Sequence, residues 1–270
     1  MSLLESREEG GRKVSVSEIL VTGGTGSLGR RVVDRLRSAG RDVRVLSRSG
    51  RPGTVRADLL TGEGLDEVVE GIDAIVHCAS SPTKTRQTDV EGTERLLRAA
   101  GRAGMPHFVF ISIVGVDRNS YFPYYRMKLE VERVIESSPV PWTILRATQF
   151  HEFVLRIVRL LDRIPLMMMP RGFLLQPIAV GEVAERLAEL ALADPAGRVP
   201  EVGGPEVRTM AELARAYFEV VGRSRRVVEV PLPGKTARAL RGGAQLCPDR
   251  RYGKIRWEEF LRQTVHPPMD

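Results

Sequence analysis

Two patterns of hydrophobic and polar residues take turns along this chain: short apolar runs, which predict strands, and apolar residues spaced three or four positions apart, which predict helices. Short, mostly apolar runs of strand length occur at residues 19–21, 43–46, 74–76, 107–111 and 140–145. Between these runs, apolar residues recur every three or four positions, as Leu28, Val32 and Leu36 do, and this spacing is typical of a helix face that packs on a sheet. Strands that alternate with amphipathic helices predict an α/β fold around a parallel sheet.

Glycine residues at positions 23, 26 and 29 separate the first apolar run from the helix that follows it. Such a turn leaves backbone N–H groups free at the positive end of the helix dipole, where a phosphate group binds readily. Strand, glycine turn, helix and second strand in this order are typical of a dinucleotide-binding unit, and a glycine turn with no ligand is the alternative. The residues predicted to contact the dinucleotide at this turn are Gly23, Thr25, Gly26, Ser27, Leu28 and Gly29.

The end of the second predicted strand indicates which dinucleotide binds. An NAD site usually has Asp or Glu here to accept a hydrogen bond from the ribose 2′-hydroxyl, whereas this chain has Ser47, Arg48 and Ser49. A guanidinium group pairs well with a phosphate, so the sequence favours NADP over NAD. The alternative is that Arg48 is one more solvated arginine in a chain whose basic residues are mostly arginine.

Further cofactor contacts are predicted where other strands end, because ligands of open parallel sheets lie beyond the carboxyl ends of the strands. Asp58 and Leu59 follow a short predicted strand and are expected near the adenine. Ala79 and Ser80 follow the run at residues 74–76 and are expected to lie over the cofactor. The predicted cleft is therefore assembled from separate segments of the chain.

Tyr124 and Lys128 are the residues predicted to carry the chemistry. They are four positions apart on a predicted helix, so their side chains share one face, whereas Tyr125 has no lysine at that distance. A lysine cation about 4 Å from a tyrosine hydroxyl contributes roughly the 4 kcal/mol that would bring its pKa from about 10 to near 7. The alternative is a ring packed under a lysine stem. Ser112, at the end of a predicted strand, precedes the pair in the order that such a site requires.

These motifs together resemble the short-chain dehydrogenase/reductase superfamily. The chain is similar to the atypical or extended branch, which includes the NmrA-like NAD(P)H-binding proteins. The resemblance covers residues 18–150 and rests on the segments 22–29, 89–93, 111–112 and 124–128. It implies a doubly wound parallel sheet of the Rossmann type with NADP at the glycine turn.

The same resemblance implies a role for each candidate catalytic residue. It implies that Tyr124 is the general acid or base, that Lys128 holds the nicotinamide ribose, and that Ser112 orients the substrate carbonyl. The chain departs from the family pattern at Asp89, where extended members commonly have Asn, and at Ile113, where a second serine is common.

The same patterns predict how the chain divides. Residues 1–15 are expected to form a mobile N-terminal tail, residues 16–150 the NADP-binding domain, and residues 151–270 a small C-terminal substrate lobe packed on it. Residues 167–169 are three methionines between prolines, and they predict either an adaptable lid over an apolar substrate or a buried part of the core.

Composition narrows the range of partners. The 270 residues are 42% hydrophobic, and the net charge of +7 comes from basic residues interleaved with acidic ones, which favours a solvated surface and no nucleic acid. Cys78 and Cys247 provide neither a disulfide framework nor metal-ligand spacing, so we expect no metal and a cytoplasmic location. No apolar run is long enough for a membrane span, so we expect no membrane partner, and a monomer or homodimer.

The sequence thus predicts an NADP-dependent oxidoreductase that transfers a hydride between the nicotinamide and a small, apolar carbonyl or enone substrate. The alternative is an NADP-binding redox sensor, regulator or assembly factor without turnover, which has no need of a tuned tyrosine. A sugar-nucleotide epimerase is less favoured, because the candidate lid at residues 167–169 is apolar.

Overall fold

A seven-stranded sheet occupies the centre of the computed structural model, which describes residues 18–80, 86–119, 121–164 and 166–265. The predicted tail at residues 1–15 lies outside the described residues. Neighbouring strands run parallel in the order β3-β2-β1-β4-β5-β6-β9. They are β1 (Glu18–Thr22), β2 (Asp42–Ser47), β3 (Val55–Arg56), β4 (Ala74–His77), β5 (His107–Ile113), β6 (Trp142–Ala147) and β9 (Gly197–Arg198). Because the order reverses between β1 and β4, the sheet is doubly wound, and the predicted Rossmann architecture is confirmed.

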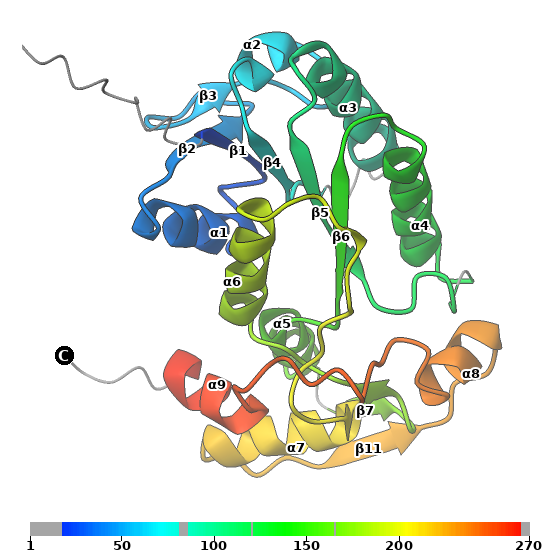
Figure 1. The fold of residues 1–270 in the computed structure, drawn as a ribbon. Helices are drawn as coiled ribbons and strands as arrows, with labels where there is room; N and C mark the ends of the chain where they lie inside the picture. Colours follow the sequence, from blue (N-terminus) through cyan, green and yellow to red (C-terminus); the bar gives the residue numbers. More distant parts are fainter. Residues whose placement is uncertain (1–17, 81–85, 120, 165, 266–270) are drawn as a thin grey trace, which may run out of the picture.

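Helices cover both faces of this sheet (Figure 1). One face is covered by α1 (Ser27–Ser38) and α6 (Val180–Ala191), and the other by α2 (Leu65–Val69), α3 (Gly92–Arg102) and α4 (Pro123–Glu136). Successive side chains of a strand point to opposite faces, so Leu20 joins the core under α3, and Ile19 and Val21 join the core under α1.

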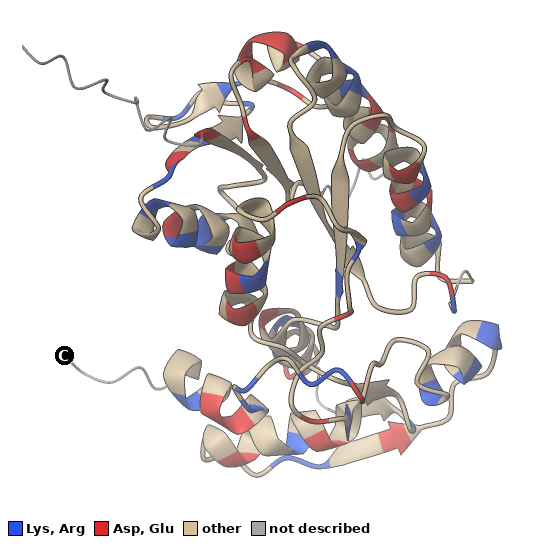
Figure 2. Cartoon of the chain, in the orientation of Figure 1, with Lys and Arg blue, Asp and Glu red and all other residues tan. Residues whose placement is uncertain are grey.

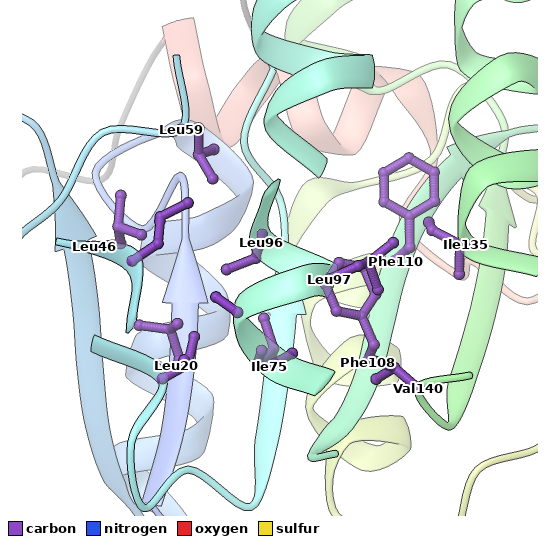
Figure 3. Close-up of a cluster of buried hydrophobic side chains, with 14 of the residues drawn as sticks. Leu20, Leu46, Leu59, Ile75, Leu96, Leu97, Phe108, Phe110, Ile135 and Val140 are labelled. Carbon is purple, nitrogen blue, oxygen red and sulfur yellow. The ribbon is translucent and has the colours of Figure 1, made fainter. Parts of the chain in front are cut away.

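The core on the α3 side is built from side chains of successive strands. Leu20, Ile75 and Phe108 come from β1, β4 and β5, and they cluster with Leu96 and Leu97 of α3 (Figure 3). Each side chain of this size contributes about 1.5–3 kcal/mol when fully buried. Charged residues of both signs lie on the outer helices, while β4 and β5 carry none (Figure 2). The sheet is therefore held mainly by apolar packing between two charged outer layers.

Two helices on this face begin irregularly. Helix α2 is short and follows Gly62 and Gly64, which have positive φ angles of 87° and 74°. Helix α3 is preceded by a π-helical stretch, η1 (Arg86–Glu91). π-Helical turns occur often at functional sites, and η1 contains Asp89.

The C-terminal part of the chain builds a second, smaller core. Its elements are α5 (His151–Leu161), β7 (Met167–Pro170), β8 (Leu174–Leu175), β10 (Arg208–Thr209), α7 (Met210–Val220), β11 (Val227–Val230), α8 (Lys235–Arg241) and α9 (Trp257–Val265). Side chains of α5, β7, α7 and α9 form one cluster there. The predicted division at residue 150 needs a correction, because α6 and β9 follow it in sequence yet belong to the layers of the large sheet. The apolar face of α6 is buried in the core under α1, and β9 pairs in parallel with β6.

The three methionines form strand β7, which pairs in parallel with β11. Met167 and Met169 are fully buried in the smaller core, whereas Met168 points outward and is 49% exposed. This is the alternation expected of a strand. The interpretation as core is therefore confirmed for Met167 and Met169, and the lid interpretation is wrong for these two.

A buried carboxylate ties α4 to the sheet. Glu132 of α4 is fully buried and accepts two hydrogen bonds from Arg146 of β6, at 2.9 and 2.7 Å. Arg198 of β9 lies 2.8 Å from the same carboxylate, and the Ser112 hydroxyl of β5 donates to it. Burial acts to lower the pKa of Arg146, but its hydrogen bonds to Glu132 and Asp117 raise that pKa overall. The Glu132 carboxylate thus connects α4 with the strands β5, β6 and β9.

We predict that Glu132→Gln destabilises the fold by about 3–5 kcal/mol, because it leaves the buried guanidinium of Arg146 without its charged partner. The matched control is Glu130→Gln on the same helix, where the ion pair with Arg86 is exposed and contributes less than about 1 kcal/mol. Urea titration of both variants gives the free energies of unfolding. Equal losses in the two variants would contradict a structural role for the buried pair.

Candidate cofactor cleft and active site

The turn between β1 and α1 brings two backbone segments unusually close together. Gly23 has a φ of 67°, and a Cβ atom there would stand 2.7 Å from the backbone nitrogen of Ala79. A Cβ atom at Gly29 would stand 2.2 Å from the carbonyl oxygen of Gly23. Only glycine fits these two positions. Gly26 caps α1 without a side-chain hydrogen bond, so the first N–H groups of the helix are available to an anion.

A cleft of about 760 Å³ lies at this turn, beyond the carboxyl ends of β1, β2 and β4. The residues that line it are Gly23, Thr25, Gly26, Leu46, Ser47, Arg48, Ser49, Arg51, Asp58, Leu59, Cys78, Ala79, Ser80 and Thr88. The structure therefore brings together the predicted residues of four separate segments. The side chain of Leu28 packs on the core under α1, and Gly29 serves the close contact between helix and turn. Ser27 is exposed at the first position of α1.

Arg51 is a lining residue that the sequence prediction missed. It lies in the loop after β2, three positions beyond Arg48, and its carbonyl oxygen accepts hydrogen bonds from the backbone and side chain of Thr54. This turn folds the loop back toward the cleft. The sequence does show a second arginine, Arg51, shortly after Arg48, but the conformation of the loop decides whether the Arg51 side chain faces the cleft.

The polar groups at the end of β2 are hydroxyls and guanidinium groups. The Ser47 and Ser49 hydroxyls lie 3.2 Å apart. The cleft also contains the carboxylate of Asp58, which accepts a hydrogen bond of 2.8 Å from the backbone N–H of Leu60. The end of β2 therefore offers donors suited to a phosphate rather than a carboxylate suited to a ribose hydroxyl.

Four side chains form a connected polar network at the rim of the cleft. The Tyr124 hydroxyl lies 3.4 Å from the Ser80 hydroxyl, which donates a 2.7 Å hydrogen bond to Asp89. The Lys128 ammonium lies 3.9 Å from the same carboxylate and 4.9 Å from the centre of the Phe110 ring. Lys128 and Asp89 are 4% and 2% exposed. The structure thus places the tyrosine at the cleft and the lysine cation behind it, against a buried carboxylate.

The two adjacent tyrosines have different surroundings. Tyr125 is 6% exposed; burial raises its pKa, and a hydrogen bond with Gln149 acts in the opposite direction. Tyr124 is half-buried and reaches Ser80, a residue of the cleft. Of the two, Tyr124 is therefore the one that faces the candidate site.

The position of Ser112 differs from the arrangement expected from the sequence. Its hydroxyl is buried and donates to Glu132, and among the described residues its hydrogen bond is not with Tyr124 or Lys128. The reason is helical spacing: Tyr124, Lys128 and Glu132 are four apart along α4, and Ser112 lies beside the third of them. Ser80 instead is the hydroxyl beside Tyr124.

Comparison with known proteins supports the nucleotide-binding interpretation of the cleft. The family described as NAD(P)H-binding matches residues 23–153, which contain the glycine turn, the cleft and the Tyr124 network. The chain is also 32% identical over 232 residues to a (4-alkanoyl-5-oxo-2,5-dihydrofuran-3-yl)methyl phosphate reductase of Streptomyces griseus subsp. griseus, covering 78% of this chain and 77% of that protein. This chain belongs to the family described as NAD(P)H-binding.

Two further similarities agree with this assignment. The chain is 26% identical over 230 residues to the photosystem II assembly factor Ycf39 of Trieres chinensis, covering 79% of this chain and 72% of that protein. The NADPH complex of the quinone oxidoreductase QOR2 of Escherichia coli has the same fold, with a TM-score of 0.76 at 17% identity, covering 92% of this chain and 100% of that chain. Solved structures with this fold include complexes with NAD and with NADPH, so the fold alone does not choose between the two cofactors.

In this NAD(P)H-binding protein, a buried histidine at the end of β4, His77, directly precedes the cleft residues Cys78 and Ala79. His77 Nδ1 lies 2.7 Å from the Thr22 hydroxyl, and Nε2 lies 2.9 Å from the Thr93 hydroxyl. Thr93 donates to the Asp89 carbonyl oxygen, so its oxygen accepts from Nε2–H; Thr22 accepts from the Ala79 N–H and donates to Nδ1. Burial, with the nearby Lys128 charge, lowers the pKa of His77 to about 3. The same burial raises the pKa of the Cys78 thiol to about 12, so this thiol is not a nucleophile at neutral pH.

The neutral His77 makes stability depend on pH. Unfolded chains bind a proton at histidine below about pH 6.5, whereas folded His77 binds one only near pH 3, so stability is lost as pH falls through this window. We predict that His77 accounts for about 2 kcal/mol of the loss between pH 7.5 and pH 5, and that His77→Gln removes this part. Urea titrations of both proteins at the two pH values measure it. His151, whose pKa is lowered to about 4 by burial, contributes equally to both proteins. An unchanged pH dependence in His77→Gln would refute the assignment.

Proposed function

We propose that this member of the NAD(P)H-binding family is an NADP-dependent oxidoreductase that transfers a hydride between the nicotinamide and a small, apolar carbonyl or enone substrate. The observation that carries the proposal is the Tyr124 hydroxyl at the rim of the cleft, 3.4 Å from Ser80 and one helical turn from the cation of Lys128. A protein that only senses its cofactor needs no proton donor at this place.

The residues of the cleft fit a dinucleotide. Gly23 and Gly29 leave no room for side chains where the turn meets α1, and the uncapped start of α1 offers N–H groups to the pyrophosphate. Arg48 and Arg51 are suited to the 2′-phosphate, and Leu59 offers an apolar surface to the adenine. When bound, NADPH would supply the hydride for reduction, and NADP⁺ would accept a hydride in oxidation.

The protein residues supply the proton and the orientation. Because Ser80 donates its own proton to Asp89, the Ser80 oxygen accepts from the Tyr124 hydroxyl, which holds that proton at the rim of the cleft. In the reductive direction Tyr124 donates this proton to the substrate oxygen, and in the oxidative direction it accepts one. Lys128 stabilises the phenolate that forms and hydrogen-bonds the nicotinamide ribose. The Asp89 carboxylate holds Ser80 and Lys128 in place.

The similarity to the Streptomyces reductase supports the substrate class. Its name describes an alkanoyl group on an oxo-dihydrofuran ring, which combines carbonyl groups with ring unsaturation, and a methyl phosphate group on the same ring. A reducible enone or ketone of this kind has an oxygen that can take the proton of Tyr124. We therefore propose small molecules with a carbonyl or conjugated carbonyl group as the first compounds to test.

An NADP-binding assembly factor without turnover is the second candidate. It is supported by the similarity to Ycf39, which is named as an assembly factor, and by the engagement of Ser112 with Glu132 instead of the cleft. A screen of ketones, aldehydes and enones separates the two candidates, with turnover measured as the loss of NADPH absorbance. Absence of turnover across the screen, together with tight NADPH binding, would favour the assembly factor.

We predict that NADPH binds about 10- to 100-fold more tightly than NADH, since charge-assisted hydrogen bonds contribute about 1.5–3 kcal/mol. Arg48→Ala and Arg51→Ala should each reduce this preference, and the double variant should remove most of it. Arg98→Ala is the control, because Arg98 is exposed on α3 and does not line the cleft. Calorimetric titration with both cofactors measures the preference. Equal affinities of the unmodified protein for NADPH and NADH would refute the assignment to NADP.

We predict that Tyr124→Phe lowers turnover by about 10²- to 10⁴-fold and leaves NADPH binding intact, because it removes the proton donor and keeps the ring. Lys128→Ala should weaken NADPH binding as well as turnover. The matched control is Tyr125→Phe, which makes the same change at the neighbouring buried tyrosine and should leave turnover within a few-fold. Steady-state kinetics and NADPH titration decide the matter, and a full rate in Tyr124→Phe would exclude the mechanism.

A further inference from the structure

The outward face of α5 and the segment that follows it have an unusual composition. In the described part of residues 153–168, every exposed side chain is either arginine or apolar. We call this set the α5 outer surface; it comprises Phe153, Arg156, Arg159, Leu160, Arg163, Ile164, Leu166 and Met168. Its apolar members are 45–61% exposed. Several exposed apolar side chains gathered on one surface indicate an interaction site.

Helical spacing arranges this surface in two rows. Val154, Leu155 and Val158 face the smaller core and are at most 4% exposed. At 3.6 residues per turn, Phe153 and Leu160 lie on the opposite side of α5, and Ile164 is exposed in the turn that directly follows the helix; we call these three residues the outward stripe. Arg156 and Arg159 of α5, together with Arg163 in the same turn, form the arginine row. The arginine row also borders a groove of about 440 Å³ between α5 and α9.

The acidic groups near this surface are already engaged or partly buried. Glu152, which lines the groove, lies 3.5 Å from Arg31 of α1, and burial raises its pKa. Asp162 pairs with Arg223 and Arg225 at 2.7 and 2.5 Å. Among the ion pairs between described residues, none involves the three arginines of the α5 outer surface; Arg156 instead lies 5.8 Å from the Phe153 ring centre. The surface is therefore both apolar and positively charged.

We propose that the α5 outer surface docks this protein on an anionic lipid bilayer. An apolar stripe flanked by arginines matches a membrane interface, where the stripe enters the boundary of the acyl chains and guanidinium groups bind lipid phosphates. A second copy of this chain fits less well, because a symmetric contact would bring two arginine rows together. A folded protein partner would need an acidic group opposite each of the three arginines, whereas an anionic lipid surface offers phosphates at any spacing.

The proposed contact is peripheral. No helix in the described part of the chain is long and apolar enough to cross a membrane. The proposal therefore departs from the expectation of no membrane partner, which considered membrane spans alone. It stands on the α5 outer surface and does not depend on the proposed redox activity.

Flotation with vesicles tests this proposal on the full chain. We expect binding to phosphatidylcholine vesicles that contain about one third phosphatidylglycerol, and weak binding to pure phosphatidylcholine. The triple variant Arg156→Gln, Arg159→Gln, Arg163→Gln should bind the anionic vesicles about 100-fold less. The matched control replaces the exposed Arg35, Arg37 and Arg98 by Gln, which removes the same net charge and should change binding only a few-fold.

A second measurement tests insertion of the apolar stripe. Phe153→Trp places a fluorescent reporter on the stripe, and its emission should shift to shorter wavelength when anionic vesicles are added. The double variant Leu160→Ser, Ile164→Ser should lower vesicle affinity at least 10-fold without lowering NADPH affinity. Equal binding by the two arginine triple variants, or an emission spectrum unmoved by vesicles, would overturn the proposal. Binding to an acidic protein but not to anionic vesicles would overturn it as well.

Discussion

The contact between the start of α1 and the turn after β1 determines where this protein can hold a nucleotide. A Cβ atom at position 29 would stand 2.2 Å from the Gly23 carbonyl oxygen, so a larger residue would push the helix away from the sheet. With glycine, α1 begins directly at the sheet edge, and its uncapped N–H groups face the cleft. The same turn contacts the backbone of Ala79, which brings the end of β4, and Ser80 after it, to the cleft. The position of the candidate chemistry therefore follows from backbone packing.

Helix α4 connects that chemistry to the stability of the fold. Three residues four positions apart on one face have three different partners: Tyr124 contacts Ser80 at the cleft, Lys128 lies against Asp89, and Glu132 holds the buried arginine of β6. The contact of Glu132 with Arg146 fixes the helix against the sheet, and this also fixes the position of Tyr124 beside Ser80. A carboxylate at position 89, instead of the asparagine common in the family, gives the buried lysine a charged partner before any cofactor binds.

The surface of the molecule differs between its two parts. On the outer helices of the Rossmann part, basic and acidic residues are mixed (Figure 2), as expected of a solvated surface. On α5 the exposed charges are arginines alone, next to exposed apolar side chains. A net charge of +7 is therefore less informative than its distribution, because the arginines of α5 lie beside exposed apolar side chains. The cleft and the α5 outer surface use different elements, so one can be altered without the other.

The sequence by itself determined the parallel sheet, its helices, the glycine turn and most of the residues that line the cleft. These features depend on local periodicity and on the backbone freedom of glycine, which act over a few residues. Tertiary structure alone decided the partner of each polar side chain. Ser112 contacts Glu132 instead of Tyr124, and Arg51 faces the cleft, because strand register, helix position and loop conformation choose between alternatives that are equal in sequence. The return of α6 to the large sheet was decided in the same way, because its apolar face is buried against that sheet, and β9 then pairs with β6.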